Sequence, residues 1–328
     1  MKGQRVLVTG AGGFIGSHLV EALLDRGAKV RALVRYKSDG GIGNLQFLPA
    51  EARAAVQVAH GDLTDAESVM RLVTDCDAIF HLGALVAIPY SYSAPRSYVT
   101  TNIDGTLNIL EAARACETPC LVHASTSEVY GSARYVPMDE AHPLHAQSPY
   151  AATKIAADKL VESYVDSFGV KAVILRPFNT FGPRQSARAV IPAIIGQALG
   201  GGPVIRLGAT APIRDLTYVT DTVAGFMAAA VANGIWGGCY NLGTGTGIAI
   251  GDLARLILRE MGVEARIETE EQRLRPAASE VERLISCHDA FTKATGWRPD
   301  VHFEDGIRRT IAFFRQRPDL LPRGGYTQ

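Results

Sequence analysis

The sequence predicts an α/β fold in which helices cover both faces of a doubly wound parallel sheet. Short apolar runs rich in β-branched residues recur along the first half of the chain, and segments with helical spacing of apolar residues separate most of them. Strands and helices that alternate in this way connect through right-handed crossovers, so the strands run parallel and are buried on both sides. After Arg176 glycine and proline interrupt the chain, which indicates a second, smaller unit.

The expected elements follow from the same pattern. Strands are expected at residues 5–9, 29–34, 56–60, 78–82, 120–124 and 172–175, and helices after the first strand and at 66–74, 95–116 and 148–168. Residues 220–231 and 239–242 have the patterns of a helix and a strand that could rejoin the sheet. The pieces from residue 250 onward, which end in a helix at 303–315, are too small to fold alone, so we expect a lid over the C-terminal edge of the sheet.

Composition and charge exclude several classes of protein. Lysine plus arginine and aspartate plus glutamate number 33 each among 328 residues, so the net charge is zero and a general affinity for nucleic acid or an anionic membrane is excluded. Five cysteines without a C-x-x-C pair predict neither a disulfide framework nor a zinc site, and His142 and His145 lack a third ligand, so we expect no metal. Without a membrane-length apolar run or a signal peptide, the chain is predicted to be cytoplasmic.

A glycine-rich turn joins the first strand to the first helix. Gly10 lets the chain turn, Gly13 lets backbone N–H groups approach a pyrophosphate, and Gly16 lets the helix pack closely on the strand. A glycine-rich turn of this kind can also occur without binding any ligand. The strand–turn–helix context favours dinucleotide binding, with Phe14 and Ile15 at the start of the helix.

The end of the second strand bears on the choice between NAD and NADP. An acidic residue about twenty positions after the loop would bind the ribose diol of NAD, but Val34 stands there and Arg35 follows it. Arg35 could pair with the 2′-phosphate of NADP, or it could be a solvated charge at a strand end. We favour NADP over NAD, and we expect Asp62 to contact the adenine.

A tyrosine and a lysine four residues apart are the first candidates for catalysis. Tyr150 and Lys154 share one face of a predicted helix, and a nearby cation favours the phenolate that accepts a proton from an alcohol. Alone, the pair would more often be an ordinary surface contact. A polar cluster at residues 125–131 follows a predicted strand, at the sheet edge where active sites of parallel sheets lie, and this favours catalysis.

Together these motifs resemble the extended short-chain dehydrogenase/reductase family. The resemblance rests on the loop at 9–16, the cluster at 126–131, the helix start at 148–154 and Arg176-Pro177-Phe178-Asn179, and it covers nearly the whole chain. It implies a Rossmann fold, a tightly held nicotinamide cofactor, a nucleotide-diphosphate sugar as substrate and a homodimer. Further cofactor contacts are then expected from Leu63, Leu82, Ala84, Tyr150, Lys154 and Pro177.

Within the family the chain resembles the sugar 4,6-dehydratases. Simple 4-epimerases usually carry a small residue at the position of Glu128, whereas these dehydratases carry a glutamate. The stretches at 84–92, 184–192, 272–276 and 279–284 are similar to the 4,6-dehydratases of legionaminic-acid biosynthesis. That resemblance implies a nucleotide-linked N-acetylglucosamine as substrate, with the base and the sugar left open.

The resemblance assigns roles to five residues. Tyr150 would remove the proton of the 4-hydroxyl, Lys154 would hold Tyr150 ionised, and Thr126 would hydrogen-bond O4. Glu128 would remove the C5 proton once the 4-ketone has acidified it. Ser127 stands where many relatives have an aspartic acid that protonates the leaving hydroxyl, so either it relays a proton or Glu128 performs both transfers.

The second unit is expected to bind the substrate. We assign residues 1–178 to the nicotinamide-binding domain, with 217–247 returning to it, and 179–216 and 248–328 to the substrate-binding domain. Arginines suit a diphosphate because each offers a fork of donors. The expected substrate contacts are Pro89, Tyr90, Asn179, Arg184, Arg188, Arg214 and Arg275.

Three other functions remain open at this point. A decarboxylase acting on a nucleotide-linked glucuronic acid also carries a Thr-Ser-Glu cluster and would need a cation for the sugar carboxylate. A 4-epimerase is disfavoured by Glu128. A non-catalytic protein that senses cofactor ratio would have no use for Tyr150, Lys154 and Glu128 together.

Overall fold

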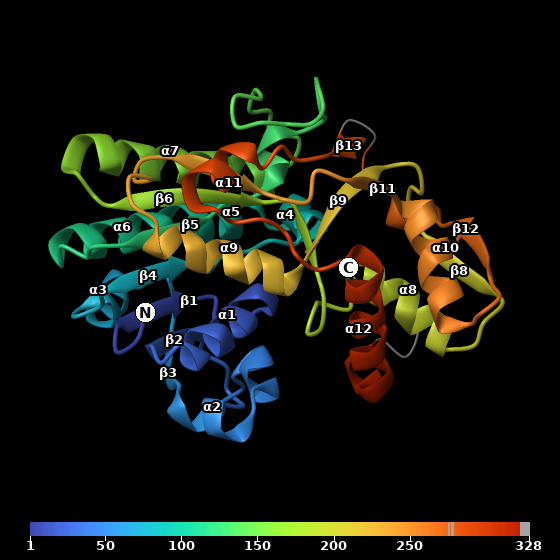
Figure 1. Ribbon diagram of the computed structural model, residues 1–328, viewed down its shortest axis with the longest axis horizontal. Helices are drawn as coiled ribbons and strands as arrows, with labels where there is room; N and C mark the ends of the chain where they lie inside the picture. The colour runs from blue at the N-terminus through green and yellow to red at the C-terminus, as the bar shows by residue number, and fades with distance from the viewer. Residues whose placement is uncertain (275, 277–278, 322–328) are drawn as a thin grey trace.

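A single large parallel sheet forms the centre of the molecule, as the sequence predicts (Figure 1). The computed structural model describes residues 1–274, 276 and 279–321. The strands run in the order β10-β6-β5-β4-β1-β2-β3, and each neighbouring pair is parallel. Their bounds are β1 (Arg5–Thr9), β2 (Lys29–Arg35), β3 (Gln57–Gly61), β4 (Ala78–His81), β5 (Leu121–Ala124), β6 (Ala172–Pro177) and β10 (Cys239–Leu242).

Helices cover both faces of this sheet. Successive residues of a strand point to opposite sides, and since the strand residues are apolar on both sides, both faces are buried beneath helices. On β1, Val6 and Val8 pack in one core with α1 (Phe14–Asp25) and α9 (Val219–Val231). Leu7, between them, packs in the other core with α3 (Ala66–Val73), α6 (Gly105–Ala115) and α7 (Pro149–Phe168). The strand expected at 239–242 joins the sheet as β10, which confirms that this segment rejoins it.

A smaller α/β lobe lies beside the sheet, at the right of Figure 1. One small sheet contains β7 (Asn179–Phe181), β9 (Ile213–Tyr218), β11 (Gly247–Ala249) and β13 (Arg283–Leu284), and another contains β8 (Val204–Leu207) and β12 (Arg266–Thr269). Its helices α8 (Val190–Leu199), α10 (Ile250–Met261) and α12 (Phe303–Gln316) pack together, and α11 (Asp289–Thr295) packs on β10. The boundaries that the sequence analysis gives for the two domains remain a prediction.

Helix α8 was not expected from the sequence. Its residues are almost all apolar, so no amphipathic pattern marks it. Pro192 lies in the first turn, where a missing N–H removes no intrahelical hydrogen bond. Ile191, Ile194 and Ile195 are buried, and this packing stabilises the helix.

The single helix expected at 95–116 is interrupted. It consists of α5 (Pro95–Tyr98), a π-helical segment Val99–Asp104 and α6. Asn102, in the π-helical segment, accepts a hydrogen bond from Leu85 N (2.8 Å) and donates to Leu85 O (3.0 Å) and Thr153 Oγ1 (3.0 Å). These bonds hold the segment to α7 and to the chain after β4, so they explain the wider turn.

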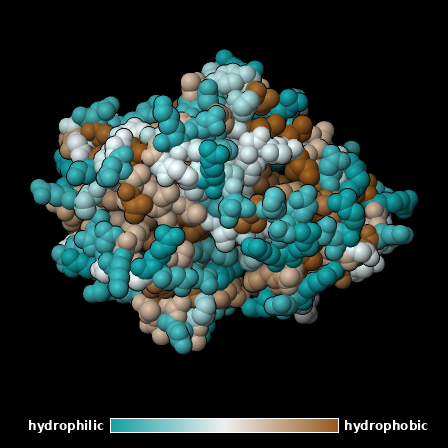
Figure 2. Space-filling model, in the orientation of Figure 1, coloured by the Kyte–Doolittle hydropathy of each residue, from teal (hydrophilic) through white to brown (hydrophobic). Residues whose placement is uncertain are grey.

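The remaining elements are short. They are α2 (Ala50–Ala55), α4 (Ile88–Ser93) and the 3₁₀ turns Gly43–Phe47, Ser127–Tyr130, Glu271–Arg273 and Pro318–Leu320. The face seen in Figure 2 is mostly hydrophilic, with hydrophobic side chains scattered over it. Among the described helices, none is both long and apolar enough to cross a membrane.

Candidate active site

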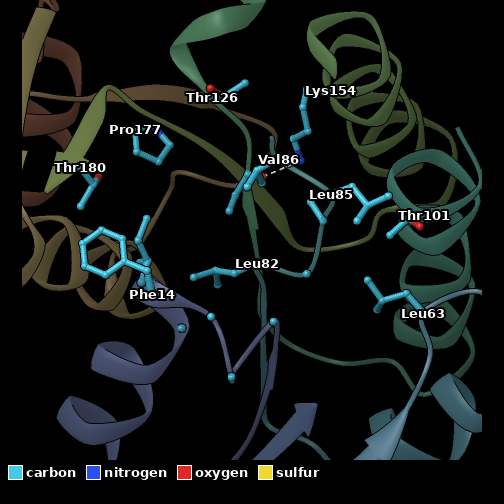
Figure 3. A pocket seen from close by; sticks show the side chains of 18 of the residues that line it. Phe14, Leu63, Leu82, Leu85, Val86, Thr101, Thr126, Lys154, Pro177 and Thr180 are labelled. Carbon is cyan, nitrogen blue, oxygen red and sulfur yellow. Dashed lines mark hydrogen bonds between the residues drawn. The ribbon is translucent and has the colours of Figure 1, made fainter. Parts of the chain in front are cut away.

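A cavity of about 710 Å³ opens at the carboxyl ends of the central strands (Figure 3). Its lining comes from the ends of β1, β2, β4, β5 and β6, from the start of α7 and from the second lobe. Asn179, Thr180 and Ala189 are the contributions of that lobe. The cavity therefore lies where the doubly wound sheet meets the smaller lobe, as ligand sites of such sheets do.

The glycine loop forms one wall of the cavity with its backbone. Gly10 has φ +67°, and a Cβ there would lie 2.8 Å from Gly83 N, so only glycine fits. A Cβ on Gly16 would lie 2.2 Å from Gly10 O, which shows how closely α1 packs on β1. No side chain caps the N-terminus of α1. Its open N–H groups therefore fit a pyrophosphate, as the sequence predicts.

The part of the cavity next to the glycine loop, at the ends of β2 and β3, is where an adenosine is expected. Val34 and Arg35 line it from the end of β2, Lys37 follows that strand, and Asp62 and Leu63 follow β3. Arg35 Nε lies 3.7 Å from Asp62 Oδ2, and both side chains are largely exposed. An exposed ion pair of this length is weak, so the guanidinium is available to a ligand.

The catalytic candidates meet at the inner end of the cavity. Tyr150 lies at the start of α7, where Ser148 caps the helix, and Thr126, Ser127 and Glu128 follow β5. Thr126 hydrogen-bonds the phenol of Tyr150 and accepts a bond from Glu128 N at 3.2 Å. The structure thus brings the five predicted catalytic residues, Thr126, Ser127, Glu128, Tyr150 and Lys154, to one cavity.

Tyr150 is held as a phenol rather than a phenolate. Burial raises the pKa of Tyr150, and the charge of Glu128 and the neighbouring Tyr98 add to this, against the hydrogen bond from Thr126. The expectation that Lys154 holds Tyr150 ionised is therefore not met by the protein groups around Tyr150. A further positive charge is needed for Tyr150 to accept a proton.

Lys154 is buried beneath the cavity. Its Nζ donates to Ala124 O at 2.7 Å, the dashed line in Figure 3. Burial lowers the pKa of Lys154 to about 8, and the Asp158 carboxylate opposes this. The side chain is therefore fixed in place and, although its pKa is lowered, stays mostly protonated at neutral pH.

Glu128 and Ser127 differ in what they offer a substrate. Within the described part of the chain, the Glu128 carboxylate makes no side-chain hydrogen bond or ion pair, and the residue is half-buried. Ser127 is buried at the cavity wall. Glu128 is therefore a carboxylate available to act as a base.

All of the predicted cofactor contacts line this cavity. They include the loop residues and Arg35, Asp62, Leu63, Leu82, Ala84 and Pro177. The sequence did not point to Lys37, Leu85, Val86, Thr101, Thr180, Ala189 and Phe226, which also line it. Thr101 reaches the cavity from the π-helical segment, which no local pattern revealed.

The predicted substrate residues divide into several groups. Asn179 lines the cavity, and its Oδ1 is buried without a hydrogen-bond partner in the described structure. Arg188 is exposed, and its charge acts on the Tyr98 hydroxyl, where it opposes the rise that burial causes in the pKa of Tyr98. Arg214 is buried and pairs with Glu280 at 3.2 Å. Pro89 and Tyr90 lie on α4, with Tyr90 exposed, and Arg275 lies outside the described residues.

Arg184 does not reach the cavity, contrary to the expectation that it binds the diphosphate. Its guanidinium pairs with Glu21 of α1 at 2.6 Å and is 9% exposed. Its carbonyl accepts a bond from Asn44 Nδ2 at 3.0 Å, and the residue has φ +66°. The side chain is therefore committed to holding the second lobe against α1.

Comparison with known proteins agrees with this geometry. The profile of the family described as GDP-mannose 4,6 dehydratase matches residues 7–310. The chain belongs to this family. It is therefore an extended short-chain dehydrogenase/reductase of the sugar-nucleotide 4,6-dehydratase type, and the family comprises NAD-dependent sugar dehydratases and epimerases.

Two curated relatives cover nearly the whole chain. The low-salt glycan biosynthesis protein Agl12 of Haloferax volcanii is 34% identical over 94% of this chain and 98% of its own length. A dTDP-glucose 4,6-dehydratase of Actinoplanes sp. is 32% identical over 95% of this chain and 98% of its own.

Two solved structures are similar in fold. The dTDP-glucose 4,6-dehydratase DesIV of Streptomyces venezuelae, with NAD and TYD bound, has a TM-score of 0.87 and 30% identity over 97% of this chain and 98% of its own. A UDP-N-acetylglucosamine 4-epimerase of Methanobrevibacter ruminantium, in complex with UDP-N-acetylmuramic acid, has the same TM-score and identity over 97% and 100%. The chain is thus equally similar in fold to a dehydratase and to an epimerase, so the residues of the site must distinguish the two activities.

Proposed function

We propose that this protein is a nucleotide-sugar 4,6-dehydratase that converts a nucleotide-linked N-acetylglucosamine to the 4-keto-6-deoxy sugar. The observation that carries the proposal is the free carboxylate of Glu128 in the same cavity as Tyr150 and Thr126. A 4-epimerase needs only the transfer of a hydride and a proton at C4, whereas a dehydratase must also remove the proton at C5. Glu128 supplies the base for that extra step.

The cofactor fits the glycine wall and the open start of α1. When bound, an oxidised nicotinamide supplies a hydride acceptor for C4, a hydride donor for C6 after reduction, and a positive charge beside Tyr150. The backbone N–H groups of the glycine loop around Gly13 would hold the pyrophosphate, and Lys154 would hold the nicotinamide ribose. The positive charge of the cofactor would favour the phenolate that burial disfavours.

In the first step Tyr150 takes the proton of the 4-hydroxyl while the C4 hydrogen leaves as hydride. Thr126, which hydrogen-bonds Tyr150, would hydrogen-bond the same substrate oxygen and hold it against the phenol. The product of this step is a 4-ketone, which acidifies the neighbouring C5–H bond. The sugar thereby becomes ready for elimination.

In the second step Glu128 removes the C5 proton and the 6-hydroxyl leaves as water. The leaving oxygen needs a proton, and Ser127 is a poor acid on its own. We propose that Glu128 delivers the proton it has taken, with Ser127 as a hydrogen-bond relay. Hydride would then return from the reduced cofactor to C6, water would supply the C5 proton through Glu128, and Tyr150 would release its proton to water, so the sugar has lost water with no net oxidation.

NADP is the cofactor that we propose this chain prefers. Arg35 and Lys37 place two cations at the adenosine end of the cavity, and Val34 provides no carboxylate to bind a free ribose diol. The weak pair between Arg35 and Asp62 leaves the guanidinium free to bind a 2′-phosphate.

Two copies of the chain are proposed to pair through α6 and α7. Ile109, Leu110 and Val161 of these helices are buried in the monomer core, while Leu107 and Leu160 are only partly buried beside it. Size-exclusion chromatography with mass detection at micromolar concentration tests the pairing: a single-chain mass would reject it.

A panel of UDP-, GDP-, CDP- and dTDP-sugars with NAD or NADP tests the function, with mass spectrometry as the readout. Loss of water from an N-acetylglucosamine nucleotide is expected. Loss of carbon dioxide from a glucuronic acid would favour a decarboxylase, and a 4-epimer of unchanged mass, seen by NMR, would favour an epimerase. Cofactor binding without turnover of any sugar would favour a cofactor sensor.

A further inference from the structure

A layer of buried polar side chains lies directly beneath Lys154, between the sheet and helices α6 and α7. It contains His123 of β5, Asp158 of α7 and Arg176 of β6, each at most 3% exposed. Such groups are costly to bury, so their positions call for an explanation. No step of the proposed reaction uses them.

Asp158 is the centre of this layer. Its Oδ2 accepts hydrogen bonds from Ser125 Oγ (2.8 Å) and from Arg176 Nε and Nη2 (3.2 and 3.0 Å). Ser125 immediately precedes Thr126, and Asp158 lies one helical turn beyond Lys154 on the same face of α7. The carboxylate thus ties the end of β5 to the helix that carries Tyr150 and Lys154.

The second oxygen of Asp158 is not used for hydrogen bonding. Oδ1 has no hydrogen-bond partner among the described residues, and His123 Nε2 is 3.6 Å away. Burial lowers the pKa of His123 to about 4, so the ring is neutral near neutral pH. Burial acts to raise the pKa of Asp158, but the contact with His123 and the charges of Arg176 and Lys154 outweigh it and hold it below its usual value.

Asp158 supplies the negative charge of this layer. Arg176 and Lys154 are both cationic when protonated, and the Asp158 carboxylate pairs with Arg176 at 3.0 Å and acts electrostatically on Lys154. Of the other titratable groups around Lys154, His81 of β4, His123 of β5 and Tyr150 of α7 are uncharged at neutral pH, while Glu128 is a carboxylate in the same cavity whose charge acts on Tyr150.

We propose that Asp158 is a positioning residue for the reaction, which keeps the buried Lys154 side chain protonated and aligned beneath Tyr150. Arg176 and Ser125 hold the carboxylate in place, and its charge compensates the ammonium that the cavity would otherwise disfavour. Because Ser125 and Thr126 are adjacent, the same carboxylate also fixes the strand end that carries Thr126. This inference rests on the proposed role of Lys154 beside Tyr150.

The protonation of Lys154 can be measured without any substrate. Protein labelled with ¹³C at lysine Cε is titrated by NMR, and the Lys154 signal is assigned by its loss in Lys154→Arg. In Asp158→Asn the titration midpoint is expected to fall by about one to three pH units, because the compensating charge is gone. Ser125→Ala removes a bond to the same carboxylate but no charge, so its midpoint should stay near that of the wild type.

The Asp158→Asn substitution leaves Arg176 buried without an anion, so a second variant guards against misfolding. Asp158→Asn/Arg176→Met removes the ion pair as a unit, which buried pairs often tolerate, and its midpoint should again lie below that of the wild type. An unchanged midpoint in a folded variant overturns the proposal. Failure of both variants to fold also overturns it, because the role would then be structural.

The titration midpoint of Lys154 tests this inference independently of the proposed function, because it is measured without substrate. If no sugar in the panel reacts, the dehydratase proposal fails while the Lys154 titration still decides the role of Asp158. If a substrate is found, Asp158→Asn should lower kcat at least tenfold with little change in KM, since Asp158 lies outside the cavity lining. A change in KM alone would contradict a positioning role.

Discussion

Glu128 is the residue on which the choice of reaction depends. Replacement of Glu128 by Gln keeps the shape of the side chain but removes the base for the C5 proton. We expect cofactor binding to be unchanged and formation of the 4-keto-6-deoxy product to fall about 100- to 10,000-fold. Mass spectrometry of the products measures this, and fluorescence titration with the cofactor is the control. Undiminished turnover would remove Glu128 from the mechanism.

Arg35 decides the cofactor preference in the same local way. Replacement of Arg35 by Ala removes the fork that would bind a 2′-phosphate, so the Kd for NADP should rise about 10- to 100-fold while that for NAD stays the same. Lys37→Ala, which alters a second cation on the same wall, is the matched control and should have the smaller effect. Calorimetry with both cofactors measures this, and an equal loss for NAD would contradict the assignment.

At the scale of single elements, the sequence predicted best those parts whose pattern is local. The central strands and the glycine loop follow from apolar runs and from glycines that only a tight turn requires. Helix α8 and the π-helical segment could not be predicted in this way. The first is an almost uniformly apolar helix stabilised by the burial of Ile191, Ile194 and Ile195, and the second is held by hydrogen bonds from Asn102 to residues distant in the sequence.

Two arginines in the segment between β7 and α8 also differ in a way that depends on tertiary contacts and not on the local sequence pattern. Arg184 and Arg188 looked alike in the sequence, but Arg184 pairs with Glu21 of α1, whereas Arg188 is exposed near Tyr98. Only the tertiary structure separates a clamp between lobes from a cation that is free to meet a substrate.

Alanine variants of these two arginines should therefore behave differently. Arg184→Ala is expected to lower the free energy of unfolding by about 1 to 3 kcal/mol, because Glu21 loses its partner. Arg188→Ala should leave stability unchanged and raise the KM of the nucleotide sugar about tenfold or more. Urea denaturation and steady-state kinetics measure the two effects, and a reversal of the two phenotypes would contradict the placement.

At the scale of the whole molecule, His123, one of two buried histidines near the site, links the free energy of unfolding to pH. Burial lowers the pKa of His123 from 6.5 to about 4 in the folded protein. Below pH 6.5 His123 is protonated in the unfolded chain but stays neutral in the folded chain. The free energy of unfolding therefore decreases as the pH falls toward 4, by up to about 3 kcal/mol. His123→Phe has no ring proton to gain and should show a shallower decline across this window. Urea denaturation between pH 7 and 4.5 compares the two proteins, and parallel slopes would show that the acid sensitivity originates elsewhere.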